Sequence, residues 1–327
     1  MTRFLFFLLA TVSFLTNKVC AQQAIDLSAP PGEPALFAEN FISTPMYERD
    51  MAISPKGDEI LYTVMVPYSN FQTIVCSKKK GNAWSKPEVV SFSGRYSDLE
   101  PAFSGDGNRL FFSSNRPFDD NSQNPAGKTK DFDIWYVERV NGNWSIPKNA
   151  GAPVNTEEDE YYPSVASNGN LYYTAQYKGG VGREDIYVAR WQNGAYSAPV
   201  VLDTMVNSAS YEFNAFVSPD EQFILFSSQG RKDEKGRGDL YISVKDKSNN
   251  WQKAKNLSLI NSDRLDYCPF VSFDKKAFFF SSESHSLKRS FDKPVVYGDL
   301  RQAAGQVRNG TGNIYWVDIN FLREYLK

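Results

Sequence analysis

The fold is decided by the stretch Glu100-Pro101-Ala102-Phe103-Ser104-Gly105-Asp106-Gly107 and the run Leu110-Phe111-Phe112-Ser113-Ser114 that follows it, because the chain repeats this pattern. An apolar segment leads through a small-residue turn into an aromatic run that ends in small hydroxyl residues. Short runs of this kind between turn residues predict β-strands. The residues equivalent to Pro101 in the other copies are Met51, Pro163, Ala215 and Pro269. A unit of roughly 50 residues therefore occurs five times.

Each copy continues into a third strand, such as Asp133-Ile134-Trp135-Tyr136-Val137. Four copies then pass through a tight turn into a fourth strand, as in Asn141-Gly142-Asn143-Trp144, where Asn and Gly supply positive φ angles. Four strands per repeat predict an all-β, five-bladed β-propeller. Aromatic residues make up 15% of the chain, as blades stacked face to face require. We expect one domain over residues 22–327, with blades near residues 45–92, 97–155, 159–207, 211–261 and 265–320.

The fifth copy has no fourth strand of its own, because only residues 321–327 follow its third strand. An unpaired edge strand invites aggregation, and a propeller removes it by borrowing a strand from the other end of the chain. The segment 35–42, just before the first repeat, is suitably placed. We expect it to complete the last blade.

Residues 1–21 have the features of a signal peptide. Arg3 precedes an apolar stretch from Phe4 to Leu15, and Val19-Cys20-Ala21 provides small residues before the cleavage point. Lipid anchoring at Cys20 is the alternative, although Val19 stands where a lipoprotein has a small residue. No 18-residue apolar run follows residue 21, so no membrane span is expected. These features predict a periplasmic or secreted protein. We also expect it to be a monomer.

The charge of the mature chain bears on which partners it can bind, and the positions of its cysteines bear on whether it forms a disulfide. Removing Arg3 and Lys18 from 36 basic side chains leaves 34 against 38 acidic ones, which argues against nucleic acid as a partner. After cleavage only Cys76 and Cys268 remain, and the repeat places them on different strands of different blades. We expect two buried free thiols rather than a disulfide.

The repeat resembles the TolB-type, WD-repeat-like β-propeller family. The matching segments are Ser218-Pro219-Asp220, Phe112-Ser113-Ser114-Asn115-Arg116 and Arg183-Glu184-Asp185-Ile186-Tyr187. The resemblance covers about residues 45–320 and implies a propeller; for TolB itself it implies docking to a Pal-like lipoprotein. TolB, however, has six blades and an N-terminal α/β domain, whereas this chain has five repeats preceded by a strand.

Acidic residues recur three positions before every anchor: Glu48, Asp98, Glu160, Glu212 and Asp266. The residue that opens each third strand is also polar, and the two sets should share one face of the ring. Carboxylates at such positions accept hydrogen bonds from loop N–H groups and from neighbouring hydroxyls. Two other interpretations stay open: catalysis, and a cation or cationic-ligand site in the axial channel. We expect no cofactor unless such a site binds calcium.

The loops between second and third strands are long, and long loops on a rigid scaffold often carry binding residues. They span residues 115–132, 176–184, 229–238 and 283–312, and three of them contribute the candidate binding residues Arg116, Arg183 and Arg231. The last loop is basic, and either a solvated loop or a docking arm fits it.

Two classes of function remain. The first is a non-enzymatic recognition module that binds an envelope or extracellular protein, a peptide or a glycan on the long-loop face. The alternative is a five-bladed propeller glycoside hydrolase, which needs two carboxylates in different protonation states. Repeat-equivalent acids would have similar environments, so the candidates for that chemistry are Asp50, Glu100 and Asp159, which we place outside the repeat pattern. The single histidine, His285, makes a Ser-His-Asp triad or a histidine-ligated zinc site improbable.

Overall fold

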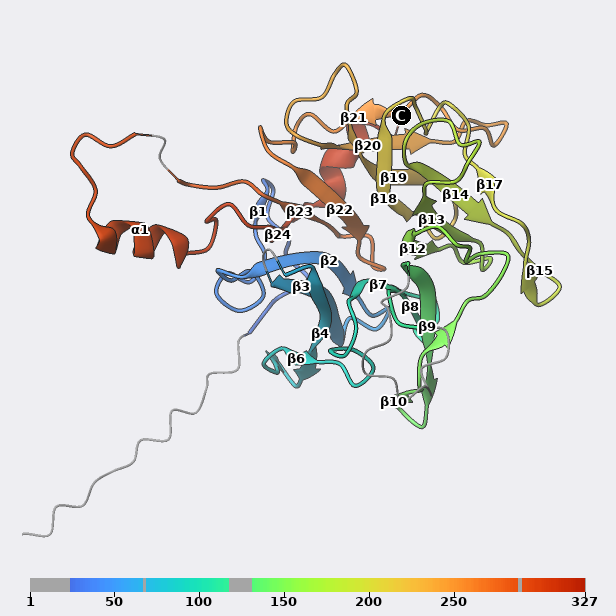
Figure 1. Cartoon of the computed structure of the whole chain (residues 1–327), viewed down its shortest axis with the longest axis horizontal. Helices are drawn as coiled ribbons and strands as arrows, with labels where there is room; N and C mark the ends of the chain where they lie inside the picture. The colour runs from blue at the N-terminus through green and yellow to red at the C-terminus, as the bar shows by residue number, and fades with distance from the viewer. Residues whose placement is uncertain (1–23, 67–68, 118–130, 288–289, 327) are drawn as a thin grey trace, which may run out of the picture.

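The computed structural model describes residues 24–66, 69–117, 131–287 and 290–326, and it shows a five-bladed β-propeller (Figure 1). The all-β fold and the number of blades predicted from the repeat are therefore confirmed. The predicted signal peptide, residues 1–21, and most of the loop 115–132 lie outside the described residues. Within those residues, no helix has the length and apolar character needed to cross a membrane.

The blades follow one another along the chain, and each is an antiparallel sheet whose first strand lies nearest the axis. Blade 1 contains β2 (Tyr47–Ile53), β3 (Glu59–Val66), β4 (Phe71–Lys80), β5 (Ala83–Trp84) and β6 (Glu88–Val89). Blade 2 contains β7 (Asp98–Phe103), β8 (Arg109–Ser114), β9 (Asp133–Val140), β10 (Asn143–Trp144) and β11 (Lys148–Asn149). Blade 3 contains β12 (Glu160–Val165), β13 (Leu171–Ala175), β14 (Asp185–Ala189) and β17 (Val200–Val201), with the hairpin β15 (Trp191–Gln192) and β16 (Ala195–Tyr196). Blade 4 contains β18 (Tyr211–Val217), β19 (Phe223–Gln229), β20 (Asp239–Val244) and β21 (Lys255–Asn256), and blade 5 contains β22 (Asp266–Val271), β23 (Ala277–Ser282), β24 (Asn313–Asp318) and β1 (Ala35–Leu36).

The small-residue turn between the first two strands is held by a serine hydroxyl. Ser104 Oγ accepts a hydrogen bond from the backbone N–H of Arg109 at 2.9 Å, and Ser218 Oγ accepts one from Phe223 at 3.0 Å. Side-chain acceptors of this kind satisfy turn donors that the sheet leaves unpaired. The turn motif therefore serves the geometry of the blade.

The N-terminal segment closes the ring, but over a shorter length than the sequence predicted. Strand β1 pairs with β24 through Ala35–Trp316 and Leu36–Tyr315, and the N–H of Phe37 donates to the carbonyl of Ile314 at 2.9 Å. The prediction that pairing extends to residue 42 is wrong. Ala38 and Asn40 have φ angles of 46° and 61°, so the chain turns away from the blade after Phe37.

The loop 283–312 contains a helix that the sequence analysis did not predict. Helix α1 (Tyr297–Ala304) buries none of its residues and lies away from the ring of blades (Figure 1). After β24 the chain forms the 3-10 helix η1 (Ile319–Glu324), which packs Leu322 into the core. Cys76 on β4 and Cys268 on β22 are buried free thiols, as predicted.

The closing contact gives a stability prediction. Phe37 is fully buried and packs edge-on against Phe279 and Trp316, with ring centroids 5.1 and 5.2 Å away. Phe37→Ala should lower the free energy of unfolding by about 3 to 5 kcal/mol, because it leaves a cavity beside the strand pair that joins the two ends of the ring. Urea unfolding would measure this loss. The exposed neighbour Glu33→Ala is the control, and equal midpoints for the two variants would contradict the role of Phe37 in closure.

Candidate functional site at the propeller axis

The five repeated acids are all buried, and each binds donors of its own blade or of the adjacent blade. Glu160 accepts hydrogen bonds from Thr156 Oγ1 at 2.7 Å and from the Tyr177 hydroxyl at 2.7 Å. In four blades the donor is the Ser or Thr four residues earlier, and the pairs are Thr44 with Glu48, Thr156 with Glu160, Ser208 with Glu212 and Ser262 with Asp266. Asp98 is bound instead by Ser93 and Ser114. These contacts tie the loop before each inner strand to that strand.

Two of the three candidate arginines belong to the same network. Arg116 is buried and pairs with Asp98 at 2.6 Å, and Arg231 pairs with Glu212 at 2.8 Å. Arg183 is exposed and donates to the Tyr211 hydroxyl at 3.1 Å. Among the residues that the structure describes, no three His, Cys, Asp or Glu side chains are grouped so that they could hold a metal ion.

A second set of side chains comes from a bulge in the innermost strand of every blade. Each of these strands shifts register at the bulge, and its bulged residue has a positive φ angle. The five residues and their φ angles are Asp50 at 58°, Glu100 at 62°, Tyr162 at 52°, Asn214 at 51° and Cys268 at 54°. A bulge with this conformation redirects a side chain that a regular strand would place elsewhere. All five residues are buried.

Four of the bulged residues form one polar cluster around Arg49. The guanidinium of Arg49 pairs with Asp50 Oδ1 at 2.8 Å and with Glu100 Oε1 at 3.1 Å. Cys268 Sγ lies 2.7 Å from Asp50 Oδ1, and Asn214 Nδ2 lies 3.3 Å from Glu100 Oε1. The second oxygen of Asp50, Oδ2, is buried without a hydrogen-bond partner. The cluster therefore contains two carboxylates that share one cation.

The two carboxylates have unlike surroundings. Burial, followed by the charge of Asp50, raises the pKa of Glu100 to about 7. The other oxygen of Glu100, Oε2, accepts hydrogen bonds from the N–H of Tyr162 at 2.6 Å and from Ser113 Oγ at 2.9 Å. Glu100 can therefore hold a proton near neutral pH.

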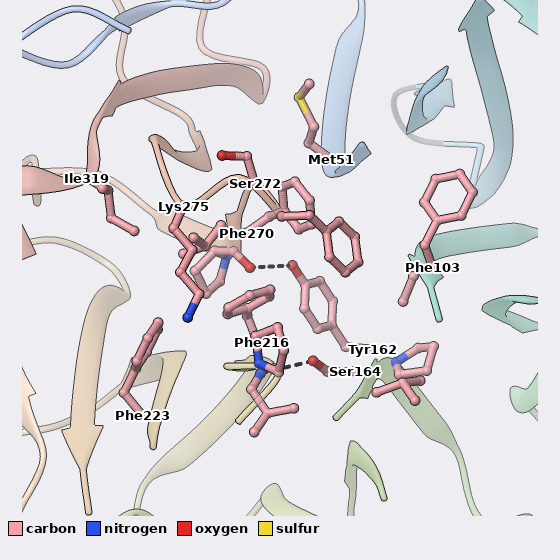
Figure 2. A pocket seen from close by; sticks show the side chains of 18 of the residues that line it. Met51, Phe103, Tyr162, Ser164, Phe216, Phe223, Phe270, Ser272, Lys275 and Ile319 are labelled. Atoms are coloured by element: carbon pink, nitrogen blue, oxygen red, sulfur yellow. Dashed lines mark hydrogen bonds between the residues drawn. The ribbon is translucent and has the colours of Figure 1, made fainter. Parts of the chain in front are cut away.

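Glu100 also lines a cavity of about 320 Å³ on the axis. Its walls are mainly apolar, and Figure 2 shows Met51, Phe216 and Phe270 around the Tyr162 side chain, whose hydroxyl donates to the carbonyl of Pro269 at 3.1 Å. The exposed Lys275 and Arg323 lie at the open side of the cavity, and the buried Glu100 and Tyr162 lie at its inner side. The other lining residues include Phe103, Phe223 and Ile319 of η1. An apolar cavity with a few converging polar groups and a perturbed carboxyl is the usual form of a ligand site.

The structure brings together two of the three acids that the sequence analysis named for catalysis. Asp50 and Glu100 meet through Arg49, whereas Asp159 is exposed and accepts a hydrogen bond from the N–H of Phe132 at 2.7 Å. The expectation that Asp50 and Glu100 lie outside the repeat is wrong, because both occupy the bulge position immediately before an anchor. The remaining members of the cluster, Arg49, Asn214 and Cys268, were missed, although comparing the residue before each anchor would have found the last two.

The comparisons with known proteins concern the fold. Neither a protein-family model nor a curated protein sequence matches the chain. A glycoside hydrolase of known structure matches 89% of this chain and 92% of its own, with a TM-score of 0.53 and 10% identity. BT0996, solved as an RGII complex, matches over 89% of this chain and 89% of its own, with a TM-score of 0.50 and 9% identity. An α-L-arabinofuranosidase from Lactobacillus brevis matches 85% of this chain and 93% of its own, with a TM-score of 0.46 and 11% identity. At such identities the likeness shows a shared fold.

These findings correct two expectations. The assignment to the TolB-type, WD-repeat-like family is wrong, because the structural matches described above are a glycoside hydrolase and BT0996 rather than a TolB-type propeller. The motifs that suggested it serve blade geometry instead: Ser218 holds a turn, and Ser114 binds Asp98. The expectation of a non-enzymatic recognition module is corrected as well, because the structures that share this fold include a glycoside hydrolase.

The buried acids predict how stability depends on pH. Burial raises the pKa of Glu48 and Glu160 to about 7 and that of Asp266 to about 6. In the unfolded chain a glutamate titrates near 4.3, so between about pH 4.5 and 7 the folded state binds more protons and stability falls as pH rises. Glu160→Gln removes this titration, and the variant should gain up to about 3 kcal/mol relative to the wild type between about pH 4.5 and pH 8.

Urea unfolding at several pH values would measure that difference. The exposed neighbour Glu157→Gln serves as the matched control and should show a constant difference from the wild type. A difference for Glu160→Gln that does not change with pH would contradict the raised pKa.

Proposed function

We propose that this protein is a carbohydrate-active enzyme of the glycoside hydrolase type, with its reaction centre at the axial acid cluster. The observation that carries the proposal is the pairing of Asp50 and Glu100 on one guanidinium, where burial and then the charge of Asp50 raise the pKa of Glu100 to about 7. Pairs of carboxyl groups whose environments separate their protonation states are the signature of acid and base roles.

In this proposal Glu100 is the general acid. A glycosidic bond breaks when a carboxylic acid protonates the leaving oxygen and a second, ionised carboxylate balances the positive charge that develops on the sugar. Glu100 lines the cavity, and its proposed role is to protonate the leaving oxygen of a glycan bound there. Its bonds from Tyr162 N–H and Ser113 Oγ fix Oε2, so the orientation of the carboxyl is set before substrate binds.

Asp50 supplies the second carboxylate, and its charge adds to the effect of burial in raising the pKa of Glu100. Its charge opposes the ionisation of Glu100, while Arg49 keeps the two groups close together. Arg49 is itself held against the ring of Tyr267, 5.2 Å from the ring centre. The second oxygen of Asp50, Oδ2, accepts no hydrogen bond from the protein, so its lone pairs are available to a ligand.

The cavity walls also suit a sugar ring. The aromatic side chains of Phe216 and Phe270 offer flat apolar surface for the C–H groups of a carbohydrate, and Glu100 lies at the inner side of the cavity. The proposed ligand is a glycan, and an exported enzyme with a periplasmic or extracellular glycan substrate fits the leader-like sequence of residues 1–21.

Turnover of aryl glycosides tests the proposal. The wild type should hydrolyse at least one member of a panel that includes 4-nitrophenyl α-L-arabinofuranoside, and Glu100→Gln should lower kcat by about 10² to 10⁴ fold, as expected for loss of a general acid. Because Glu100 must be protonated, kcat/KM should decline as pH rises through about 7. The absorbance of released 4-nitrophenol measures the rate.

The control for that experiment is Asp159→Asn, which removes an exposed carboxylate outside the cluster and should keep the wild-type rate. The proposal of glycoside hydrolysis with Glu100 as the general acid is contradicted if no glycoside in the panel is cleaved, or if Glu100→Gln cleaves one as fast as the wild type.

A further inference from the structure

A second cavity lies between blades 2 and 3, outside the acid cluster. It is a groove of about 810 Å³ whose lining includes Asp106, Arg109, Glu138, Trp191 and Tyr196. Val165 lines both this groove and the axial cavity, so the two adjoin.

Trp191 departs from the pattern of the other blades. In the outer hairpins of blades 1, 2 and 4, the residue opposite the recurring aromatic residue is a cation, and the pairs are Lys79 with Trp84, Arg139 with Trp144 and Lys245 with Trp251. In blade 3 the corresponding pair is Trp191 with Tyr196. A cation at this position packs over the aromatic ring of the hairpin. Arg139 lies 3.5 Å from the ring centre of Trp144, and Lys245 lies 4.8 Å from that of Trp251. The fold therefore does not require tryptophan at position 191.

The Trp191 side chain is held in place yet stays 39% exposed. The backbone N–H of Trp191 donates to Asn170 Oδ1 at 3.0 Å, and its ring meets Tyr196 edge-on at 4.8 Å. Gly169, with φ of +89°, allows the ring to lie close, because a Cβ at that position would come within 3.0 Å of Trp191 Cδ1. The hairpin that carries this residue projects from the edge of the ring (Figure 1). A fixed, exposed indole is a ready surface for stacking.

Polar groups with fixed geometry line the same groove. Glu138 accepts hydrogen bonds from Arg109 at 2.8 Å and from Lys148 at 2.6 Å, and Arg109 lies over the Tyr136 ring at 4.8 Å. The charged lining residues are Asp106, Glu138, Arg109 and Arg139, so acidic and basic groups balance. A balanced lining gives an anion or a cation no net attraction, whereas its paired donors and acceptors match the hydroxyl groups of an uncharged ligand.

From this arrangement we infer that the groove between blades 2 and 3 is a second binding site, which holds a neutral polysaccharide chain against Trp191 and Tyr196. The C–H face of a sugar ring packs on the indole, and adjacent hydroxyls bind Arg109 and Glu138. Binding at the groove stands on its own contacts. Only the further step, delivery of the same chain to the axial cavity, rests on the proposed glycoside hydrolase function.

Affinity electrophoresis through gels that contain arabinan or arabinoxylan tests the site. At least one of these neutral polysaccharides should retard the wild type, and Trp191→Ala should raise the dissociation constant at least about tenfold, as loss of a central aromatic contact does. Trp191→Phe, which keeps an aromatic face, should recover most of the affinity. The matched control is Tyr297→Ala, which removes an exposed aromatic side chain from α1 and should bind as the wild type does.

The outcomes separate this inference from the proposed function. Glu100→Gln should keep wild-type retardation although its kcat is lowered, and Trp191→Ala should keep wild-type turnover of the small aryl glycosides. Retardation that depends on Trp191 supports the groove even if no glycoside is cleaved. The inference is overturned if neither neutral polysaccharide retards the wild type, if both Trp191 variants bind as the wild type does, or if acidic polygalacturonate binds more tightly than either neutral polymer.

Discussion

One backbone constraint organises the centre of this molecule: the innermost strand of every blade carries a residue in the left-handed conformation. Such a conformation costs a non-glycine residue on the order of 1 to 3 kcal/mol, and it persists only where the surrounding structure enforces it. Here the neighbouring strands continue their pairing on both sides of each bulge. The scaffold thus holds five strained residues around one axis, and their side chains are different in every blade.

The bulge explains how similar acids two residues apart take different roles. In a regular strand, residues i and i+2 face the same side, so Glu48 and Asp50, or Asp98 and Glu100, would share one environment. The extra residue breaks that alternation. Glu48 and Asp98 bind Thr44 and Ser93 within the scaffold, whereas the acids at the bulge meet at Arg49. A symmetric repeat therefore produces an asymmetric centre.

The sequence was informative wherever structure repeats. Turn serines, aromatic runs and hairpin glycines recur along the chain, so the number of blades and the closure by the N-terminal segment could be predicted. Asp50 and Glu100 could be named as acids of interest, but not as partners, because Asp, Glu, Tyr, Asn and Cys carry no common signal for a positive φ angle. The end of β1 could not be predicted, because it is set by the positive φ angles of Ala38 and Asn40. The position of Trp191 opposite Tyr196, where other blades have a cation, could be recognised only from the register of the paired strands.

The pairing of β1 with β24 has a consequence for the order of folding. Ala35 finds its partner Trp316 only when nearly the whole propeller sequence is available, whereas most strand pairs join near neighbours in the chain. Contacts of such long sequence separation form late and slow folding. As the chain is synthesised from its N-terminus, blades 1 to 4 can assemble in turn, while the β1 segment must stay unpaired until the last blade emerges. The ring is completed by the first strand made and the last strand to appear, so a chain interrupted before residue 313 would keep an open edge.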